Sequence, residues 1–102
     1  MNGVNVMDEK PADVVQLALK ALHEREGTYG PVEEHHARTA GIVSALLGMD
    51  FKPEWVALFF IADKLARHMH SHHIDNLVDI CGYAECQNRV HQHQEQGHDQ
   101  RA

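Results

Sequence analysis

Two pairs of charged residues in the second half of the chain have the spacing of a site for an anionic ligand. Lys64 and Arg67 are three residues apart, and Asp75 and Asp79 are four residues apart. Residues three or four apart share one face of an α-helix, so each pair forms one patch if both segments are helical. Lysine and arginine donate to phosphate oxygens, and carboxylates bind hard cations such as Mg²⁺. The sequence therefore indicates a site for a phosphorylated small molecule, with or without a divalent cation.

Each of the two aspartates also has a structural explanation. Asp75 stands where the last helix is expected to begin, which suits a helix cap or a first-turn acid. Asp79 stands inside that helix among apolar neighbours, where a buried carboxylate needs Lys64, Arg67 or a metal ion as its partner. We therefore expect Asp79 to belong to the site or to an ion pair that shapes the site.

Three further acidic residues are candidate metal ligands. Asp63 is four residues from Arg67, so its alternative is a helix-surface ion pair worth roughly a few tenths of a kcal/mol. Glu33 shares a helix face with His36, and these two residues could complete a metal site with Asp79. Its neighbour Glu34 is a further candidate ligand. The alternative for both glutamates is a solvated helix face.

Gly82 and Tyr83 follow the two aspartates in the same expected helix. Glycine inside a helix costs about 1 kcal/mol relative to alanine, so its presence indicates the close approach of another backbone or of a ligand. Tyr83 would either pack on a ligand or fill an edge of the core. We include Tyr83 among the expected ligand-binding residues.

Histidines cluster at the junction between the last two expected helices, as His68, His70, His72 and His73. Imidazole binds zinc and nickel, but this spacing matches no standard zinc site. Adventitious binding and plain surface exposure are the alternatives.

The composition excludes several classes of partner. The 102 residues carry a formal charge of −6, so no basic face is expected for nucleic acid. No targeting signal is visible, and the longest apolar run, residues 55–62, is too short to span a bilayer. Cys81 and Cys86 point about 140° apart on a helix, so no disulfide is expected, and neither has the context of a catalytic nucleophile. These features predict a cytoplasmic protein.

The hydrophobic pattern predicts four helices, over residues 11–26, 32–47, 53–70 and 74–90. Pro11 suits a first turn, and Gly27 and Gly48 suit helix ends. Residues 1–10 are expected to be a flexible leader. Residues 91–102 are rich in glutamine, histidine and charge and are expected to be a disordered tail. Strand signals are missing, so the expected fold class is all-α, a four-helix antiparallel bundle with a single domain over residues 11–90.

The apolar residues also predict the core and an interface. Inward positions are expected on the first two helices at Val14, Val15, Ala18, Leu19, Leu22, Ala40, Val43, Leu46 and Leu47. Residues 55–62 are apolar all round, which indicates a helix packed on several sides within the bundle or across a dimer interface. A small domain gains stability by burying more apolar surface, so we expect a homodimer or higher homo-oligomer.

The order of these motifs resembles a known group of proteins. The chain has Tyr29-Gly30-Pro31, then Lys64-Leu65-Ala66-Arg67, and then Asp75 to Asp79-Ile80-Cys81-Gly82-Tyr83-Ala84. This order is similar to that of a small-domain family carried mainly by phages, which looks like a divergent branch of the MazG-like all-α nucleotide pyrophosphohydrolases. The resemblance covers about residues 28–84. It implies a nucleotide-sized ligand in a pocket between helices, often at a subunit interface, with magnesium as the usual cofactor.

The chain departs from the active MazG-like enzymes in one motif. In those enzymes one helix supplies Glu-x-x-Glu and the next supplies Glu-x-x-Asp, which chelate the catalytic ions. Here Asp63-Lys64-x-x-Arg67 stands at the first motif, while Asp75 and Asp79 keep the carboxylates of the second. Two cations in place of two anions remove metal ligands but leave phosphate donors. The departure therefore favours binding over hydrolysis.

We therefore expect a protein that binds a nucleotide or a nucleotide-like phosphorylated molecule through Lys64, Arg67, Asp75, Asp79 and Tyr83. In a phage, such a protein would sequester a host signalling nucleotide and so counter defence. One alternative is a Mg²⁺-dependent nucleoside triphosphate pyrophosphohydrolase, with metal ligands from Glu33 or Glu34, Asp63, Asp75 and Asp79. The other is a non-catalytic module that binds a host protein through residues 55–62.

Overall fold

The computed structural model describes residues 13–101, and these form four α-helices. They are α1 (Val14–Tyr29), α2 (Val32–Leu47), α3 (Pro53–His70) and α4 (Ile74–Arg101). The expected all-α four-helix fold is confirmed, and no strand occurs between residues 13 and 101. The predicted leader, residues 1–10, lies outside the described residues.

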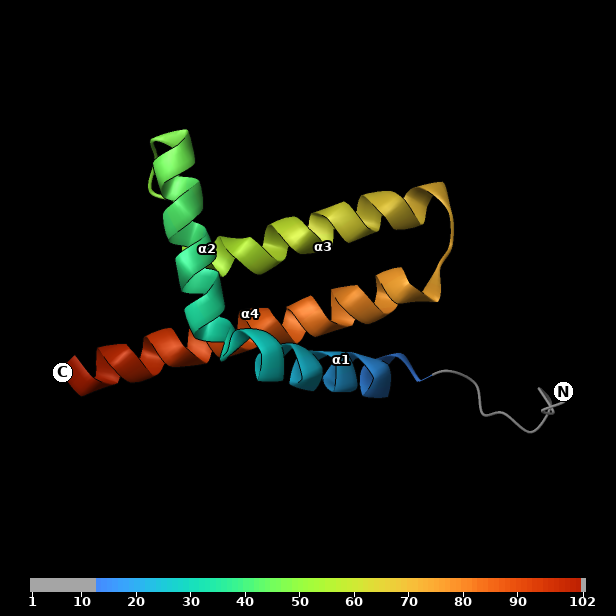
Figure 1. The fold of residues 1–102 in the computed structure, drawn as a ribbon, viewed down its shortest axis with the longest axis horizontal. Helices are drawn as coiled ribbons and strands as arrows, with labels where there is room; N and C mark the ends of the chain where they lie inside the picture. Colours follow the sequence, from blue (N-terminus) through green and yellow to red (C-terminus); the bar gives the residue numbers. More distant parts are fainter. Residues whose placement is uncertain (1–12, 102) are drawn as a thin grey trace, which may run out of the picture.

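The helices pack around α4 (Figure 1). α3 and α4 lie side by side and antiparallel, joined by a short turn, and they share the most extensive contact in the fold. α1 packs along the other side of α4 and runs in the same direction. α2 crosses between these two layers, and its carboxyl-terminal half projects away from the other helices.

Both ends of α1 lie three residues later than predicted. The side chain of Asp13 caps the helix, with its Oδ1 accepting hydrogen bonds from the amides of Val15 (3.0 Å) and Gln16 (3.3 Å). The predicted end at Gly27 is wrong, because Gly27 lies inside α1 and Gly30, with φ of 84°, ends the helix. The predicted start at Pro11 lies outside the described residues.

The other helix ends follow the sequence more closely. Gly48 has φ of 67° and stops α2 as predicted, and α3 begins at Pro53. The predicted end of α4 near Val90 is wrong, because the helix continues to Arg101. The added residues include good helix formers and no proline, so helix propagates through a segment whose polarity had predicted disorder.

The core consists of two small clusters. One contains Leu22, Val32, Ala57 and Cys86, with Tyr83 packed against it. The other contains Ala40, Phe51 and Val56, with Val43 and Trp55 at its edge. Four of the predicted core residues are more than half exposed instead, namely Val15, Leu19, Leu46 and Leu47. Leu46 and Leu47 are exposed because the far end of α2 meets no other helix within residues 13–101.

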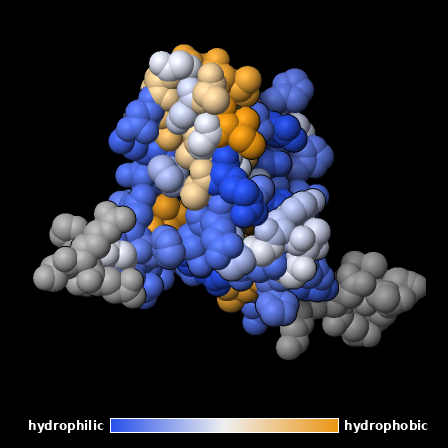
Figure 2. All heavy atoms as spheres, turned by 60° about the vertical axis from the view of Figure 1, so that its left-hand side comes forward, coloured by the Kyte–Doolittle hydropathy of each residue, from blue (hydrophilic) through white to orange (hydrophobic). Residues whose placement is uncertain are grey.

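The projecting end of α2 is apolar (Figure 2). Ile42, Leu46 and Leu47 are 62%, 78% and 62% exposed. Met49, two residues after the end of α2, is 48% exposed. Phe59 of α3 is 64% exposed, and its ring centre lies 5.3 Å from that of Phe51, which follows α2, with the two ring planes tilted by 50°. We call these five exposed residues, Ile42, Leu46, Leu47, Met49 and Phe59, the apolar end.

Among the described residues, no helix is both long enough and apolar enough to cross a membrane.

Candidate functional site

The four charged residues singled out in the sequence line one open cleft. It lies where the last turns of α3 meet the first turns of α4 and has a volume of about 770 Å³. Lys64 and Arg67 come from α3, and Asp75 and Asp79 from α4. Ligand-binding pockets commonly measure about 300–1,000 Å³, so the cleft is large enough for a nucleotide-sized molecule.

Asp79 has the partner that its position requires. Its Oδ2 lies 2.9 Å from Nζ of Lys64, and the two side chains are only 22% and 18% exposed. The ion pair joins α3 to α4 at the wall of the cleft. The ion pair fixes the ammonium group of Lys64 at this wall, where the ammonium could also donate a hydrogen bond to a phosphate oxygen.

Arg67 is more exposed and is only partly engaged. Its Nε lies 3.1 Å from Oδ2 of Asp63, and both side chains are more than half exposed. Asp63 therefore forms the helix-surface ion pair that was one of its two predicted roles. Because this contact uses Nε, the terminal nitrogens of Arg67 remain available to an anion in the cleft.

Histidines add to the polar lining of the cleft. His70 and His73 both line it, and Nε2 of His73 lies 3.4 Å from the hydroxyl of Ser71. His68 and His72 pair with each other instead, with His72 Nδ1 and His68 Nε2 3.2 Å apart. Two of the four histidines therefore line the cleft, and the other two contact each other, so the four are not gathered around one point.

The predicted metal ligands do not converge. Glu33 lines a separate pocket beside Arg89, and Glu34 is exposed in the first turn of α2. Asp75 stands exposed in the first turn of α4, as its structural explanation predicted, and also faces the cleft. Within residues 13–97, no three His, Cys, Asp or Glu side chains are grouped to hold a metal ion. The cleft thus offers two carboxylates, and one of them is bound to Lys64.

Tyr83 does not line this cleft. It lies one helical turn further along α4, in a second pocket of about 290 Å³ between all four helices. Its ring stacks on Phe60 with 5.0 Å between ring centres, and its hydroxyl accepts a hydrogen bond of 3.2 Å from Nη1 of Arg25. This hydrogen bond raises the pKa of Arg25.

Sequence reasoning missed most of the second pocket. Arg25, His36 and Phe60 come from three different helices, and no local motif marks them. The only signal was the predicted helix face shared by Glu33 and His36. His36 is 2% exposed, and its burial lowers its pKa to about 4.

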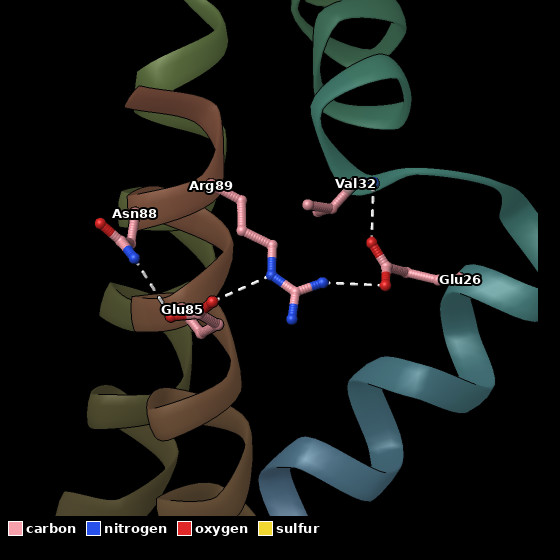
Figure 3. A network of polar contacts seen from close by, with 5 residues as sticks. All are labelled: Glu26, Val32, Glu85, Asn88 and Arg89. Atoms are coloured by element: carbon pink, nitrogen blue, oxygen red, sulfur yellow. Dashed lines mark hydrogen bonds and ion pairs between the residues drawn. The ribbon is translucent and has the colours of Figure 1, made fainter. Parts of the chain in front are cut away.

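A network of polar contacts lies beside the second pocket, whose lining includes Glu26 and Val32. We call this network, shown in Figure 3, the polar clamp. Arg89 donates from Nη1 to Glu26 (2.8 Å) and from Nε to Glu85 (2.9 Å). The same Glu26 carboxylate accepts a 3.4 Å hydrogen bond from the amide of Val32, the first residue of α2. The clamp therefore fixes the end of α1 and the start of α2 against α4. Burial raises the pKa of the adjacent Cys86 thiol to about 11, which keeps it from acting as a nucleophile.

The close approach of another backbone, which would explain a glycine at position 82, is not found there. A Cβ built on it would lie 4.0 Å from the carbonyl oxygen of Ala18, which is an ordinary van der Waals distance.

These features define an all-α domain with an open charged cleft and a neighbouring aromatic pocket. The chain belongs to the family described as Domain of unknown function (DUF6378), whose model matches residues 13–91. It is 43% identical over 63 residues to the Gene 55 protein of Mycobacterium phage L5, across 60% of this chain and 40% of that protein. The match to a phage protein agrees with the expected phage-borne family. The matched segment spans about 40% of that relative's length. No solved structure matches the chain.

Proposed function

We propose that this protein binds a nucleotide or a nucleotide-like phosphorylated small molecule in the cleft between α3 and α4, without hydrolysing it. The proposal rests on one observation: the Lys64–Asp79 ion pair lies in the same open cleft as Arg67. Arg67 is mostly exposed and contacts Asp63 through Nε. The ion pair positions an ammonium group, and the exposed guanidinium supplies a planar donor that matches phosphate geometry.

The donor set of the cleft supports binding over metal-dependent hydrolysis. A MazG-like enzyme needs carboxylates from two helices to hold its ions. Here the α3 wall carries Lys64 and Arg67, and Asp63 is engaged with Arg67. The remaining alternative, a Mg²⁺-dependent pyrophosphohydrolase, would place one ion between Asp75, Asp79 and the substrate phosphates, because Mg²⁺ is often held by one or two carboxylates and phosphate oxygens.

A phage origin of the relative suggests a biological use. A protein that holds a host signalling nucleotide without turning it over lowers its free concentration by mass action. We therefore propose sequestration of such a nucleotide, in opposition to host defence, as the role of this cleft.

The test is the retention of ligand by the purified chain. The protein is incubated with mono-, di-, tri- and cyclic nucleotides plus Mg²⁺, and the free solution and the material released on denaturation are both chromatographed. We expect intact nucleotide in the protein fraction. Arg67→Ala should weaken retention about ten-fold or more, since a charge-assisted hydrogen bond contributes about 1.5–3 kcal/mol.

A matched control is Arg38→Ala, which removes an arginine from α2, outside the cleft. It should bind as the wild type does. Monophosphate accumulating in solution, and lost with Asp79→Ala, would instead establish the pyrophosphohydrolase. Failure of every nucleotide to bind or react would favour the interaction module.

The apolar end supports a further proposal, self-association. Three of its side chains lie on the projecting part of α2, Met49 lies just after that helix, and Phe59 lies on α3. All five are about half exposed or more, and no helix within residues 13–101 covers them. We propose that a second copy of the chain covers this surface. A host protein bound there is the alternative.

A further inference from the structure

The pocket that contains Tyr83 has the lining of a site for a flat ring. Its volume of about 290 Å³ is at the lower end of the range for ligand sites, so it suits a single ring system rather than a whole nucleotide. It lies among α1, α2, α3 and α4, so all four helices hold its shape.

Aromatic rings form two of its walls. Phe60 and Tyr83 stack with their planes 30° apart, and Tyr29 and His35 stack with their planes 29° apart and their centres 5.9 Å apart. Arg25 lies 5.6 Å from the centre of the Tyr83 ring. Aromatic side chains and arginine present faces on which a heterocycle can stack.

One polar group in this pocket has an unmet hydrogen-bonding capacity. His36 lines the pocket and is only 2% exposed, and its Nδ1 has no hydrogen-bond partner among the described residues. A buried polar atom without a partner costs about 1–3 kcal/mol, which a ligand that hydrogen-bonds the imidazole would recover. An apolar ring could not do so, but a nitrogen heterocycle could.

We infer that this pocket is the subsite for a nucleobase, which stacks on the part of the Phe60 ring that Tyr83 leaves exposed and hydrogen-bonds His36. The inference deepens the proposed function and rests on it in assuming that the base belongs to the phosphorylated ligand of the cleft.

The two sites are spaced for one ligand. Phe60 precedes Lys64 by four residues on α3, and Tyr83 follows Asp79 by four residues on the antiparallel α4. The stacked pair therefore lies one helical turn, about 6 Å, along the same interface from the ion pair. A nucleotide is long enough to cover this separation.

The test is an NMR titration of the ¹⁵N-labelled full chain with two kinds of probe. Adenosine, guanosine, cytidine and uridine report on the base subsite alone, and inorganic pyrophosphate reports on the cleft alone. The amide of Gly30 lies at the aromatic pocket, and those of Ser71 and Asn76 lie at the cleft. We expect at least one nucleoside to shift Gly30 and pyrophosphate to shift Ser71 and Asn76.

Variants separate stacking from other effects. Phe60→Leu keeps an apolar side chain but removes the ring, so it should weaken nucleoside binding about ten-fold or more. Phe59→Leu is the matched control, because Phe59 is 64% exposed and does not line the pocket. His36→Phe keeps a ring but no hydrogen-bonding atom and should weaken binding by up to about ten-fold.

Each result decides between the two sites. Nucleoside shifts at Gly30 that are lost in Phe60→Leu and kept in Phe59→Leu establish the subsite. No nucleoside shift beside a clear pyrophosphate response would overturn the subsite and leave the cleft intact. Nucleoside binding without any pyrophosphate response would instead remove the proposed phosphate site. Equal nucleoside affinity in Phe60→Leu and the wild type would also overturn the inference.

Discussion

The ammonium group of Lys64 lies 2.9 Å from the carboxylate of Asp79 on the facing helix. Both side chains are largely buried, so removal of either would leave the other charge without a partner in a poorly hydrated place. The ion pair consequently links α3 to α4 and holds the ammonium group of Lys64 in a fixed place at the cleft. Arg67, by contrast, is 63% exposed and can be replaced without such a cost. This difference is why Arg67 is the better residue for testing ligand binding.

His36 predicts a dependence of stability on pH. Its pKa is lowered to about 4 in the folded chain, against an ordinary value of 6.5. Between these values the unfolded chain takes up a proton that the folded chain does not, so stability is complete above pH 6.5 and falls toward pH 4. The free energy of unfolding should fall by about 2 kcal/mol between pH 7 and pH 5 from this residue alone.

The matched variant is His36→Phe, which keeps a ring in the pocket but cannot be protonated. Urea denaturation of both proteins at pH 7 and pH 5 measures the effect, and the variant should lose about 2 kcal/mol less than the wild type. An equal loss in the two proteins would mean that His36 is not held neutral in the folded state. Carboxylates of the chain contribute equally to both proteins, so they cancel in the comparison.

At the scale of the helices, the glycines of α2 have opposite functions. Gly41 lies in the middle of the helix, and a Cβ on it would meet nothing within 4 Å. Gly48 has φ of 67° and ends the helix. Residues other than glycine rarely adopt this backbone conformation. One glycine therefore weakens α2 and the other is required at its end.

Alanine substitutions distinguish these functions. Gly41→Ala should raise the free energy of unfolding by about 1 kcal/mol, because alanine is the better helix former and the site is open. Gly48→Ala should lower it by about 1 kcal/mol, because alanine is strained at positive φ. Both changes are measured by thermal and urea unfolding. A gain in stability from Gly48→Ala would show that the turn after α2 differs from the one described.

At the scale of the whole molecule, the chain has few large buried side chains and a projecting apolar end. No large side chain among the described residues is less than 2% exposed, and Leu22 and Phe51 are the largest buried members of the two core clusters. Small domains with limited cores gain stability from contacts between subunits. Large exposed apolar patches commonly mark such contacts.

Self-association through the apolar end predicts a response to charge at that surface. Sedimentation velocity should show a dimer or larger species for the wild type and a monomer for Leu46→Glu, whose residue is 78% exposed and so is not needed for the fold of one chain. Met69→Glu is the control, because Met69 is 88% exposed at the other end of α3. A wild type that is monomeric at every soluble concentration would refute self-association and favour a host protein as the occupant.

The sequence by itself determined the helices and the cleft residues. Helical periodicity, Pro53 and Gly48 set the bounds of α2 and α3, because these signals act within a few residues along the chain. The i,i+3 spacing of Lys64 and Arg67 and the i,i+4 spacing of Asp75 and Asp79 placed each pair on one face of its own helix for the same reason. The short turn between α3 and α4 then brings the two faces to one cleft.

Only the tertiary structure decided how distant residues meet. The crossing of α2 exposed Leu46 and Leu47, which periodicity had predicted to be inward, because periodicity gives a face but not a partner. The same crossing brought His36 to Phe60 and Tyr83, residues 24 or more positions apart in sequence. Local patterns carry no information on such contacts, since they depend on the packing angles of whole helices. For that reason the residues of the charged cleft were predictable and those of the aromatic pocket were not.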